Sequence, residues 1–250
     1  MANKTPAKPN AKSVDKPLLS ILVPVYNEEK TILRVLHKVT SLPIENYEVL
    51  VVDDASHDAS KTIIDKFIET FDQPHATIKV FSHAKNRGKG AGIKTALAKA
   101  AGEYFIIQDA DLEYDPVHIP LMLLRAIEDN LPVVYGSRFK GRLENMPRAN
   151  FYANHLYNFL LRRMYKTQIT DMHTCYKMVR TDLLREFDLT SEGFGYAIEL
   201  VSKILRRGIN IHELPIDFNG RTKKEGKKIG IRDGLECIYI MFKLRLSSNI

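Results

Sequence analysis

The sequence predicts an α/β fold in which one mostly parallel sheet is covered by helices on both faces. Five short segments in the first 136 residues are apolar along nearly their whole length, which is typical of strands buried on both faces of a parallel sheet. Segments with helical patterning separate them, as the crossovers between parallel strands require. The five predicted strands are residues 18–26, 47–53, 77–82, 103–109 and 131–136.

The segments between these strands carry residues that favour helix starts. Asn27 is predicted to cap a helix that begins at Glu28, because its side chain can accept a hydrogen bond from a free backbone N–H group. Asp115 is the predicted cap of a later helix, with Pro116 at the first helical position, where no N–H group is needed. Two more helices are expected at residues 59–71 and, after a glycine-rich turn at 86–92, up to residue 101.

Beyond residue 140 the elements become less regular, but the chain is still predicted to form one domain. We expect a helix at 148–165, a strand at 175–179, a helix at 195–207, a strand at 209–218, a loop at 219–230 and a last helix at 231–245. The predicted organisation is a disordered tail at 1–17, which has few large apolar groups, one domain at 18–231 and an amphipathic helix at 232–250.

The composition is that of a globular protein. With 44% apolar and 27% charged residues among 250, it excludes a disordered chain, a collagen and a coiled-coil rod. Cys175 and Cys237 are the only cysteines and lie far apart, which excludes a disulfide framework and a thiolate zinc site. No stretch approaches the ~18 apolar residues of a membrane span, and no signal-peptide core follows the first lysines. We therefore expect a cytoplasmic protein.

Positive charge is gathered in two late segments. The chain has a net charge of +7, of which residues 138–166 carry +6 and residues 221–250 carry +5, so the rest of the chain carries −4. This distribution predicts an anionic partner, which by charge alone could be a phosphate, an anionic lipid or a nucleic acid. A basic surface that serves only solubility is the alternative interpretation.

Acidic residues end two of the predicted strands. Asp53 and Asp54 end the second strand, and Asp109 and Asp111 end the fourth, with Glu113 two residues further on. The carboxyl ends of parallel strands meet at one edge of the sheet, where such folds bind ligands. Carboxylates without nitrogen or sulfur ligands suit Mg²⁺ or Mn²⁺, which keep open positions for phosphate oxygens. The alternative is that these residues only cap helices or form turns.

The glycine-rich turn Gly88-Lys89-Gly90-Ala91-Gly92 does not match the common phosphate-binding loops. It has the pattern GxGxG instead of GxGxxG, and the upstream glycine of a P-loop is missing. We interpret its glycines as residues that allow close helix packing, with Lys89 as a neighbour of a bound phosphate.

Four further basic residues are candidates for phosphate binding. Arg138 follows the fifth strand and is expected at the same edge as Asp109 and Asp111, where its guanidinium group could bind a phosphate through two hydrogen bonds. A solvated surface position is the alternative for each candidate. The other three candidates are Arg148, Arg221 and Lys228.

The predicted helix at 148–165 is apolar nearly all round, with Arg162 and Arg163 near its end. Packing in the core is one interpretation. The other is a helix that dips into a lipid monolayer while its arginines hold anionic headgroups.

Seven motifs follow one another along the chain: VPVYNE (23–28), VVDDAS (51–56), NRGKGAG (86–92), QDADLE (108–113), GSR (136–138), TDMHTCYKMV (170–179) and the loop before Ile229. In this order and spacing they resemble family-2 glycosyltransferases over about residues 18–231. The most similar branch is that of the polyprenyl-phosphate glycosyltransferases related to dolichyl-phosphate mannose synthase. Each motif is common by itself, whereas seven in order are highly specific.

The resemblance implies a GT-A fold whose catalytic domain spans 18–231. It implies an inverting transfer of a hexose from a nucleotide-diphosphate sugar, of the GDP-mannose or UDP-glucose type, to a polyprenyl (dolichyl or undecaprenyl) phosphate. The acceptor implies peripheral association with a membrane surface. By resemblance, the nucleotide pocket is lined by Pro24, Tyr26, Glu28, Val52 and Asp54; Asp109, Ala110, Asp111 and Glu113 hold metal and diphosphate; and Arg138, Arg148, Arg221 and Lys228 contact the diphosphate or the acceptor phosphate.

The sequence departs from the family at one loop. Family members often have Gly-Glu-Ser-Lys after the arginine that corresponds to Arg221, whereas this chain has Lys-Glu-Gly-Lys-Lys at 224–228, so Lys228 stands one residue further from Arg221. A carboxyl-terminal membrane domain, present in some relatives, is also absent from this sequence.

The residues fit this chemistry by themselves. Mg²⁺ or Mn²⁺ on Asp109 and Asp111 stabilises the negative charge that develops on a departing nucleoside diphosphate. An acceptor phosphate monoester, whose second pKa is near 6, is largely dianionic at pH 7. It therefore needs positioning by basic side chains more than it needs a strong general base.

Three alternatives are considered beside this interpretation. A related transferase that acts on a sugar hydroxyl needs a carboxylate base, for which Asp171 and Glu199 are candidates. A nucleic-acid-binding module fits the pI of about 9.2 but leaves the acidic strand ends unexplained, so no nucleic acid partner is expected. A sugar nucleotidyltransferase needs a glycine-rich arginine loop after the first strand, where this chain has Pro-Val-Tyr-Asn at 24–27.

Overall fold

The computed structural model describes residues 16–193, 195–221 and 231–246, with side chains of the last segment described from Cys237 onward. Residues 1–15 of the predicted tail lie outside this part, and so do residues 222–230 of the predicted loop.

The described strands form one large sheet and one small sheet. In chain order, the strands of the large sheet are β1 (Leu19–Val25), β2 (Tyr47–Asp53), β3 (Ala76–Ser82), β4 (Tyr104–Ile107), β5 (Val133–Ser137), β7 (Lys177–Arg180) and β8 (His212–Pro215). Their spatial order is β3-β2-β1-β4-β7-β5-β8, and β7 is antiparallel to β4 and β5 while the other pairs are parallel. The predicted mostly parallel sheet is confirmed. The small sheet pairs β6 (Leu143–Glu144) with β9 (Phe218–Asn219).

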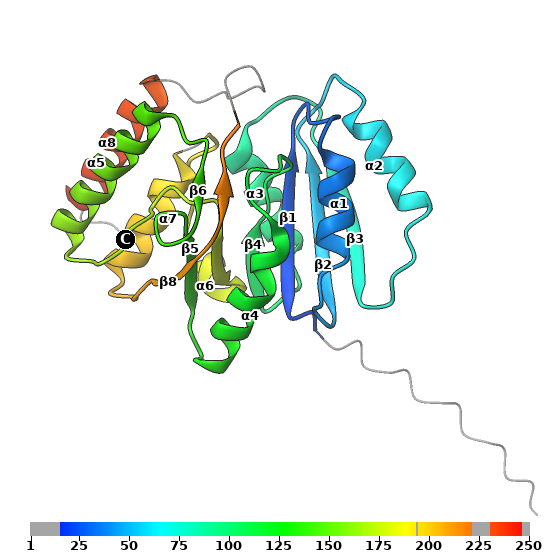
Figure 1. Ribbon diagram of the computed structural model, residues 1–250, viewed down its shortest axis with the longest axis horizontal. Helices are drawn as coiled ribbons and strands as arrows, with labels where there is room; N and C mark the ends of the chain where they lie inside the picture. Colours follow the sequence, from blue (N-terminus) through cyan, green and yellow to red (C-terminus); the bar gives the residue numbers. More distant parts are fainter. Residues whose placement is uncertain (1–15, 194, 222–230, 247–250) are drawn as a thin grey trace, which may run out of the picture.

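Helices cover both faces of the large sheet. Figure 1 shows α1 and α4 in front of the sheet, α3 behind it, and α5 and α8 side by side at one end. The helices are α1 (Ile32–Thr40), α2 (Ser60–Glu69), α3 (Lys89–Lys99), the short 3₁₀ helix η1 (Pro116–His118), α4 (Ile119–Glu128), α5 (Arg148–Tyr165), α6 (Thr181–Glu186), α7 (Tyr196–Arg206) and α8 (Ile231–Leu246). In the described part of the chain, no helix combines the length and the apolar character that crossing a bilayer requires.

The centre of the sheet is buried on both sides. Every residue of β2 and β4 is buried, which explains why both segments are nearly uniformly apolar instead of alternating. The strand β2 contains two buried acids, Glu48 and, at its end, Asp53. Glu48 is fully buried and accepts hydrogen bonds from Ser20 Oγ at 2.6 Å and from Lys79 Nζ at 2.7 Å. Burial raises the pKa of Glu48, but these donors and the N–H group of Ala101 outweigh it, so the pKa lies below its ordinary value.

This buried carboxylate joins three strands to the end of α3. Ser20 lies in β1 and Lys79 in β3, and Ser20 Oγ also accepts the N–H group of Gly102 at 2.9 Å. A side chain at position 102 has no space, because its Cβ would lie 2.4 Å from the backbone nitrogen of Ser20. Glycine is therefore required where the chain returns from α3 to β4.

One predicted helix start is wrong. The first helix begins at Ile32, not at Glu28, and Asn27 does not cap it. Asn27 has a φ of +55° and its side-chain oxygen accepts the N–H group of His57 at 2.8 Å, so it holds the loop after β2. The left-handed backbone, which asparagine tolerates well, turns the chain out of the helical direction at this residue.

The second half departs from prediction in two places. The strand expected at 209–218 is split into β8 and β9, because the chain leaves the large sheet after Pro215 and pairs with β6 instead. Phe218 then packs edge-on against Tyr114, with ring centroids 5.0 Å apart. The short elements β6 and α6 are not predicted from the sequence. The helix at 148–165 matches α5 residue for residue.

Replacing Gly102 with alanine tests the packing at the junction of α3 and β4. We expect Gly102→Ala to lower the free energy of unfolding by about 1–3 kcal/mol, because the added methyl group displaces the backbone of β1. Urea titration followed by circular dichroism measures this change. Gly193→Ala is the matched control, since a Cβ there meets no atom within 4 Å. Equal stability of the two variants would contradict the packing argument.

Candidate active site at the carboxyl edge of the sheet

The carboxyl ends of β1, β2 and β4 meet at one edge of the large sheet. Glu28 lies beyond the end of β1, Asp54 follows β2, and Asp109 and Asp111 follow β4. Arg221 reaches the same edge from the segment after β9, through hydrogen bonds to groups of β1 and β4. The structure thus brings together most of the acidic residues that were predicted from the sequence as candidates for the site.

Asp109 is paired with a cation from the glycine-rich turn. Lys89 Nζ donates to Asp109 Oδ1, and these side chains are only 17% and 20% exposed. Burial raises the pKa of Asp109, but the ammonium group of Lys89 outweighs it and the pKa lies below its ordinary value. Cys175 Sγ lies 3.6 Å from the same ammonium group. Lys89 therefore neutralises a carboxylate at this edge.

Asp111 is paired with an arginine that also binds two other acids. Nη2 of Arg221 donates to Asp111 Oδ2 at 2.6 Å, and Nη1 lies 3.1 Å from both carboxylate oxygens of Glu28. The backbone N–H group of Arg221 donates to Glu113 Oε1 at 2.6 Å. The Nε atom of Arg221 is buried and has no hydrogen-bond partner among the described residues.

The carboxylates at this edge outnumber the cations that contact them. Glu28, Asp109, Asp111 and Glu113 supply four carboxyl groups, whereas only Lys89 and Arg221 supply cations that contact them. Burial and the neighbouring charges of Asp109 and Glu113 raise the pKa of Asp111 to about 7. Oxygen-only donors that outnumber the cations beside them fit Mg²⁺ or Mn²⁺ in chemical type.

The predicted metal ligands do not form a ready three-residue cage. Within residues 16–221 and 231–246, apart from residue 194, no three side chains from histidine, cysteine, aspartate and glutamate are arranged to hold an ion. The oxygens of Asp109 and Asp111 face Lys89 and Arg221 instead. Metal binding at this edge accordingly requires these cations to share or release the carboxylates.

At the carboxyl edge of the sheet, Asp54 binds the backbone of the glycine-rich turn. Its carboxylate accepts the N–H groups of Arg87 at 2.9 Å and Gly88 at 2.7 Å, and lies 2.6 Å from His83 Nδ1. Asp54 thereby fixes the start of the glycine-rich turn. The other predicted nucleotide-pocket residues lie nearby: Pro24 and Val52 both pack beside Gly92, Tyr26 is half-buried with its ring edge-on to His57, and Ala110 is buried.

The glycine-rich turn packs against the segment before α7. The N–H groups of Gly90 and Ala91 both donate to the carbonyl oxygen of Glu192, at 2.7 and 3.3 Å. A Cβ at Gly90 would lie 2.4 Å from the carbonyl oxygen of Ser191. The interpretation as packing residues holds for Gly88 and Gly90, whereas a Cβ at Gly92 would make only ordinary contacts at 3.8 Å. The N–H groups of Gly90 and Ala91 are already bonded within the protein.

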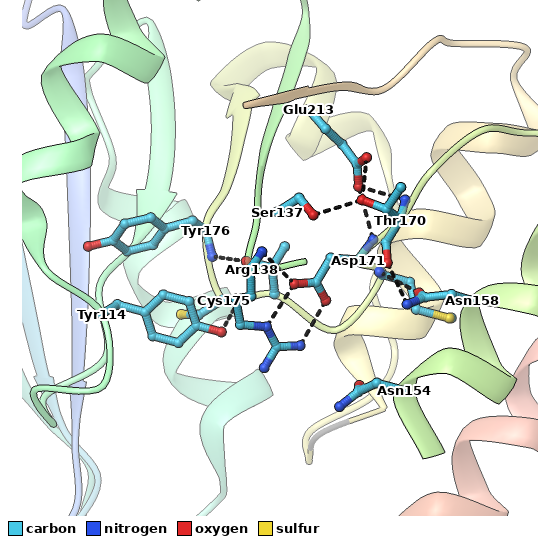
Figure 2. A network of polar contacts seen from close by, with 12 residues as sticks. Tyr114, Ser137, Arg138, Asn154, Asn158, Thr170, Asp171, Cys175, Tyr176 and Glu213 are labelled. Atoms are coloured by element: carbon cyan, nitrogen blue, oxygen red, sulfur yellow. Dashed lines mark hydrogen bonds and ion pairs between the residues drawn. The ribbon is translucent and has the colours of Figure 1, made fainter. Parts of the chain in front are cut away.

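A second polar network, shown in Figure 2, surrounds Arg138 at the end of β5. Asp171 is fully buried and accepts Nε and Nη2 of Arg138, both at 2.7 Å, as well as the backbone N–H group of Arg138 at 3.0 Å. Burial lowers the pKa of Arg138, but Asp171 outweighs it and the pKa is raised above its ordinary value. Arg138 is therefore charged and held in one orientation.

Two residues that the sequence analysis missed hold this pair in place. Glu213 in β8 accepts the backbone N–H groups of Thr170 at 2.8 Å and Asp171 at 2.9 Å. Asn158, buried in α5, accepts the N–H group of Met172 at 2.9 Å and donates to the Thr170 carbonyl. The available signal for Asn158 was a polar residue within the apolar run Leu156 to Leu161. Glu213 stands in a predicted strand without any motif to mark it.

The two carboxylates considered as general bases are engaged elsewhere. Asp171 binds Arg138, as described. Glu199 in α7 accepts the N–H groups of Thr190 and Ser191, each at 2.8 Å, and lies 2.9 Å from Lys203 Nζ. Burial raises the pKa of Glu199, but these N–H groups outweigh it and bring the pKa to about 2. Glu199 therefore serves as the anchor of a turn.

Of the remaining basic candidates, Arg148 is exposed at the first residue of α5. Lys228 lies outside the described residues.

Comparisons with known proteins agree on one family. The model of the family described as Glycosyl transferase family 2 matches residues 20–188. Dolichol-phosphate mannosyltransferase from Pyrococcus furiosus is 26% identical over 235 residues, which cover 90% of this chain and 64% of that protein. Glycosyltransferase AglD from Haloferax volcanii is 25% identical over 235 residues, covering 89% of this chain and 37% of AglD. This chain thus spans less than two thirds of the length of either relative.

Solved structures agree with the fold. Glucosyl-3-phosphoglycerate synthase from Mycobacterium tuberculosis in complex with UDP has a TM-score of 0.71 at 16% identity, covering 92% of this chain and 80% of that one. The same synthase in complex with Mn²⁺, UDP and phosphoglyceric acid also has a TM-score of 0.71, at 16% identity and 94% and 80% coverage. S. aureus TarS 1–349 in complex with UDP-GlcNAc has a TM-score of 0.63 at 19% identity, covering 93% and 67%. The fold is GT-A, as the sequence predicted.

The anchoring role of Glu199 predicts a pH-dependent loss of stability. Because the pKa of Glu199 is about 2 in the folded protein and ordinarily near 4.3, its charge stabilises the fold above about pH 4.5, and this contribution is lost as the pH falls towards 2. We expect Glu199→Gln to lower the free energy of unfolding by roughly 2–3 kcal/mol at pH 7, and by less than half of that at pH 3.

Denaturant titrations at the two pH values measure the effect. Glu192→Gln is the control, because Glu192 is about half exposed and pairs only with Arg87 at the surface among the described residues; its change should stay within ~0.5 kcal/mol. A Glu199→Gln deficit that is the same at both pH values would show that the charge of Glu199 is not what stabilises the turn.

Proposed function

The chain belongs to glycosyl transferase family 2, and we propose that it is an inverting glycosyltransferase that moves a hexose from a nucleotide-diphosphate sugar to a polyprenyl phosphate at a membrane surface. The observation that carries the proposal is the excess of carboxylate charge at the ends of β1 and β4, at the edge where α/β sheets bind ligands. The relative named dolichol-phosphate mannosyltransferase supports the choice of acceptor.

On the donor side, we assign the diphosphate and its metal to the end of β4. Asp109, Asp111 and Glu113 are the proposed ligands of Mg²⁺ or Mn²⁺, with the backbone of Ala110 beside the diphosphate. When bound there, the ion supplies positive charge to the departing diphosphate. The complex of a structural neighbour with Mn²⁺ and UDP supports this choice of cofactor.

The chain's own residues supply the rest of the donor site. Lys89, held beside Asp109, contributes a positive charge close to the leaving group. Asp54 accepts the N–H group of Gly88 and the carbonyl oxygen of Glu192 accepts that of Gly90, so hydrogen bonds on both sides of Lys89 set the position of this charge. The nucleotide is proposed to bind along the ends of β1 and β2, against Pro24, Tyr26, Glu28, Val52 and Asp54.

As the acceptor of the hexose, a phosphate fits the basic residues of this chain better than a sugar hydroxyl does. A sugar hydroxyl needs a carboxylate base, but Asp171 and Glu199 are both bound to other groups. A phosphate monoester is already mostly dianionic at pH 7 and needs only to be positioned. Arg138 is proposed to help position it, because Asp171 holds the guanidinium group in one orientation. The other proposed contacts are Arg148, Arg221 and Lys228.

The face formed by α5 and α8 is the proposed membrane surface. Tyr152, Leu156 and Phe159 lie on α5 at helical spacing and are 69%, 51% and 56% exposed. The neighbouring α8 exposes three more large apolar side chains, and Arg245 of α8 donates to the carbonyl of Met164 on α5. No acidic residue occurs between Glu144 and Asp171, which favours contact with anionic lipid. The additional exposed apolar residues are Tyr239, Phe242 and Leu246, and basic residues on the two helices include Arg148, Arg163, Lys243 and Arg245.

The acceptor assignment is tested by direct assay. With Mn²⁺ present, we expect transfer of labelled hexose from GDP-mannose or UDP-glucose to dolichyl or undecaprenyl phosphate, and no transfer to free glycans. Thin-layer chromatography of the organic phase separates the lipid product. Transfer to glycans alone would replace the phosphate acceptor with a hydroxyl acceptor.

The metal assignment predicts large losses from two single-atom changes. We expect Asp109→Asn and Asp111→Asn each to lower kcat/KM for transfer by about 10²–10⁴, because several kcal/mol of charge stabilisation at the diphosphate is lost. Asp65→Asn is the matched control, since Asp65 pairs with Lys61 on the surface of α2 and should keep full activity. Near-wild-type transfer by both site variants would refute the metal assignment.

The membrane face is tested on lipid vesicles. We expect Leu156→Ser/Phe159→Ser to weaken binding to phosphatidylglycerol vesicles by roughly 10–100-fold, because two side chains no longer enter the monolayer. Leu121→Ser/Leu124→Ser is the matched control, since these residues are similarly exposed on α4, at 51% and 50%. Sedimentation with vesicles measures both. Equal binding of the two double variants would contradict the assignment of this face.

A further inference from the structure

Arg221 contacts three acidic residues at the acidic edge. Its two terminal nitrogens divide between Asp111, at 2.6 Å, and Glu28, at 3.1 Å, and its backbone N–H group binds Glu113. The three acids come from the ends of β1 and β4, whereas Arg221 follows β9. One guanidinium group therefore lies between the carboxylates of Glu28 and Asp111, which are 83 residues apart in the sequence.

The contacts leave little room for a second cation on Asp111. Its Oδ2 atom is bound by Arg221, and its Oδ1 atom accepts the N–H group of Glu113 at 3.1 Å. Asp111 is only 7% exposed, so water screens the repulsion between like charges poorly at this position. A divalent ion bound to Asp111 would therefore be strongly repelled by the guanidinium group of Arg221, which lies 2.6 Å from the same carboxylate.

Arg221 also has an unused donor. Its Nε atom is buried and unpartnered among the described residues, although a guanidinium group normally uses most of its donors when it is buried. These contacts therefore leave one hydrogen-bond donor of Arg221 unsatisfied. A doubly charged oxygen ligand beside it would accept Nε and a terminal nitrogen together.

We infer that Arg221 and the divalent ion compete for Asp111, so that loading of the ion turns Arg221 away from the carboxylates and towards a phosphate oxygen. Arg221 is then a positioning residue with two alternative partners. The inference rests on the metal use in the proposed function and adds to it a second set of partners for Arg221. Arg221 is available to a phosphate when it no longer binds Asp111.

The competition is measured without any transfer reaction, by Mn²⁺ titration followed by electron paramagnetic resonance in the absence of nucleotide. We expect Arg221→Ala to bind Mn²⁺ at least tenfold more tightly than wild type. Arg221→Lys keeps the charge but cannot contact Glu28 and Asp111 together, so we expect intermediate affinity. Arg125→Ala removes the same charge from a surface pair on α4 and should bind like wild type.

A second readout follows the arginine itself. Arginine side-chain NMR with ¹⁵N labelling reports the Nε–H group of Arg221, which the Arg221→Lys variant identifies by its loss. Addition of diamagnetic Mg²⁺ is expected to shift this signal. The Nε–H signal of Arg138, which is bound to Asp171, serves as the internal reference and should stay in place.

The outcomes separate the inference from the proposed function. Tighter Mn²⁺ binding in the order Ala, Lys, wild type, with a shifted Arg221 signal, supports competition. Equal affinities in the three proteins, or an Arg221→Lys variant that matches wild type, overturn the inference and leave the metal assignment standing. If neither ion binds any of the proteins, the metal assignment itself is overturned and the inference with it.

Discussion

The structure depends on how negative charge is neutralised at the end of β4. Asp109 and Asp111 follow a fully buried strand and are themselves mostly withdrawn from water. Carboxylates in such a position need cations, and the cations come from distant parts of the chain: Lys89 from the start of α3 and Arg221 from the segment after β9. Because one ion pair anchors the glycine-rich turn and the other anchors the end of β9, the two aspartates organise the whole edge of the sheet.

A second charge centre stands on the other side of the antiparallel strand β7. There Arg138 is held by Asp171, and Asp171 is held in turn through the backbone by Glu213 and Asn158. Asn158 belongs to α5, the helix of the proposed membrane face, so one chain of hydrogen bonds connects that helix to the guanidinium group. The acidic edge and Arg138 are the two groups of charged residues to which the proposed transfer assigns the diphosphate and the acceptor phosphate.

The fold was largely predictable because buried parallel strands have a strong signature. Apolar runs located β1, β2, β4 and β5 to within a few residues, and α5 was located without error. The position of β3 was also predicted, although this strand is only partly buried. The failures have local physical causes. Asn27 adopts a left-handed backbone and bonds to His57, which no pattern in the sequence distinguishes from a helix cap. The strand expected at 209–218 is divided because Phe218 packs on Tyr114, a contact set by the tertiary fold.

For the site, the spacing of the sequence motifs identified the aspartates but not the residues that bind them. Arg221 meets Glu28 across 193 residues, and only the folded chain makes that pairing visible.

The central claim is that Asp109 and Asp111 hold a divalent ion against the diphosphate of a nucleotide sugar. The most direct measurement is an anomalous difference map, recorded at the manganese edge from crystals grown with Mn²⁺ and the nucleotide sugar. We expect a manganese peak within coordination distance of a carboxylate oxygen of Asp111, with Asp109 beside it. A bound nucleotide sugar without any manganese peak at these aspartates would contradict the account.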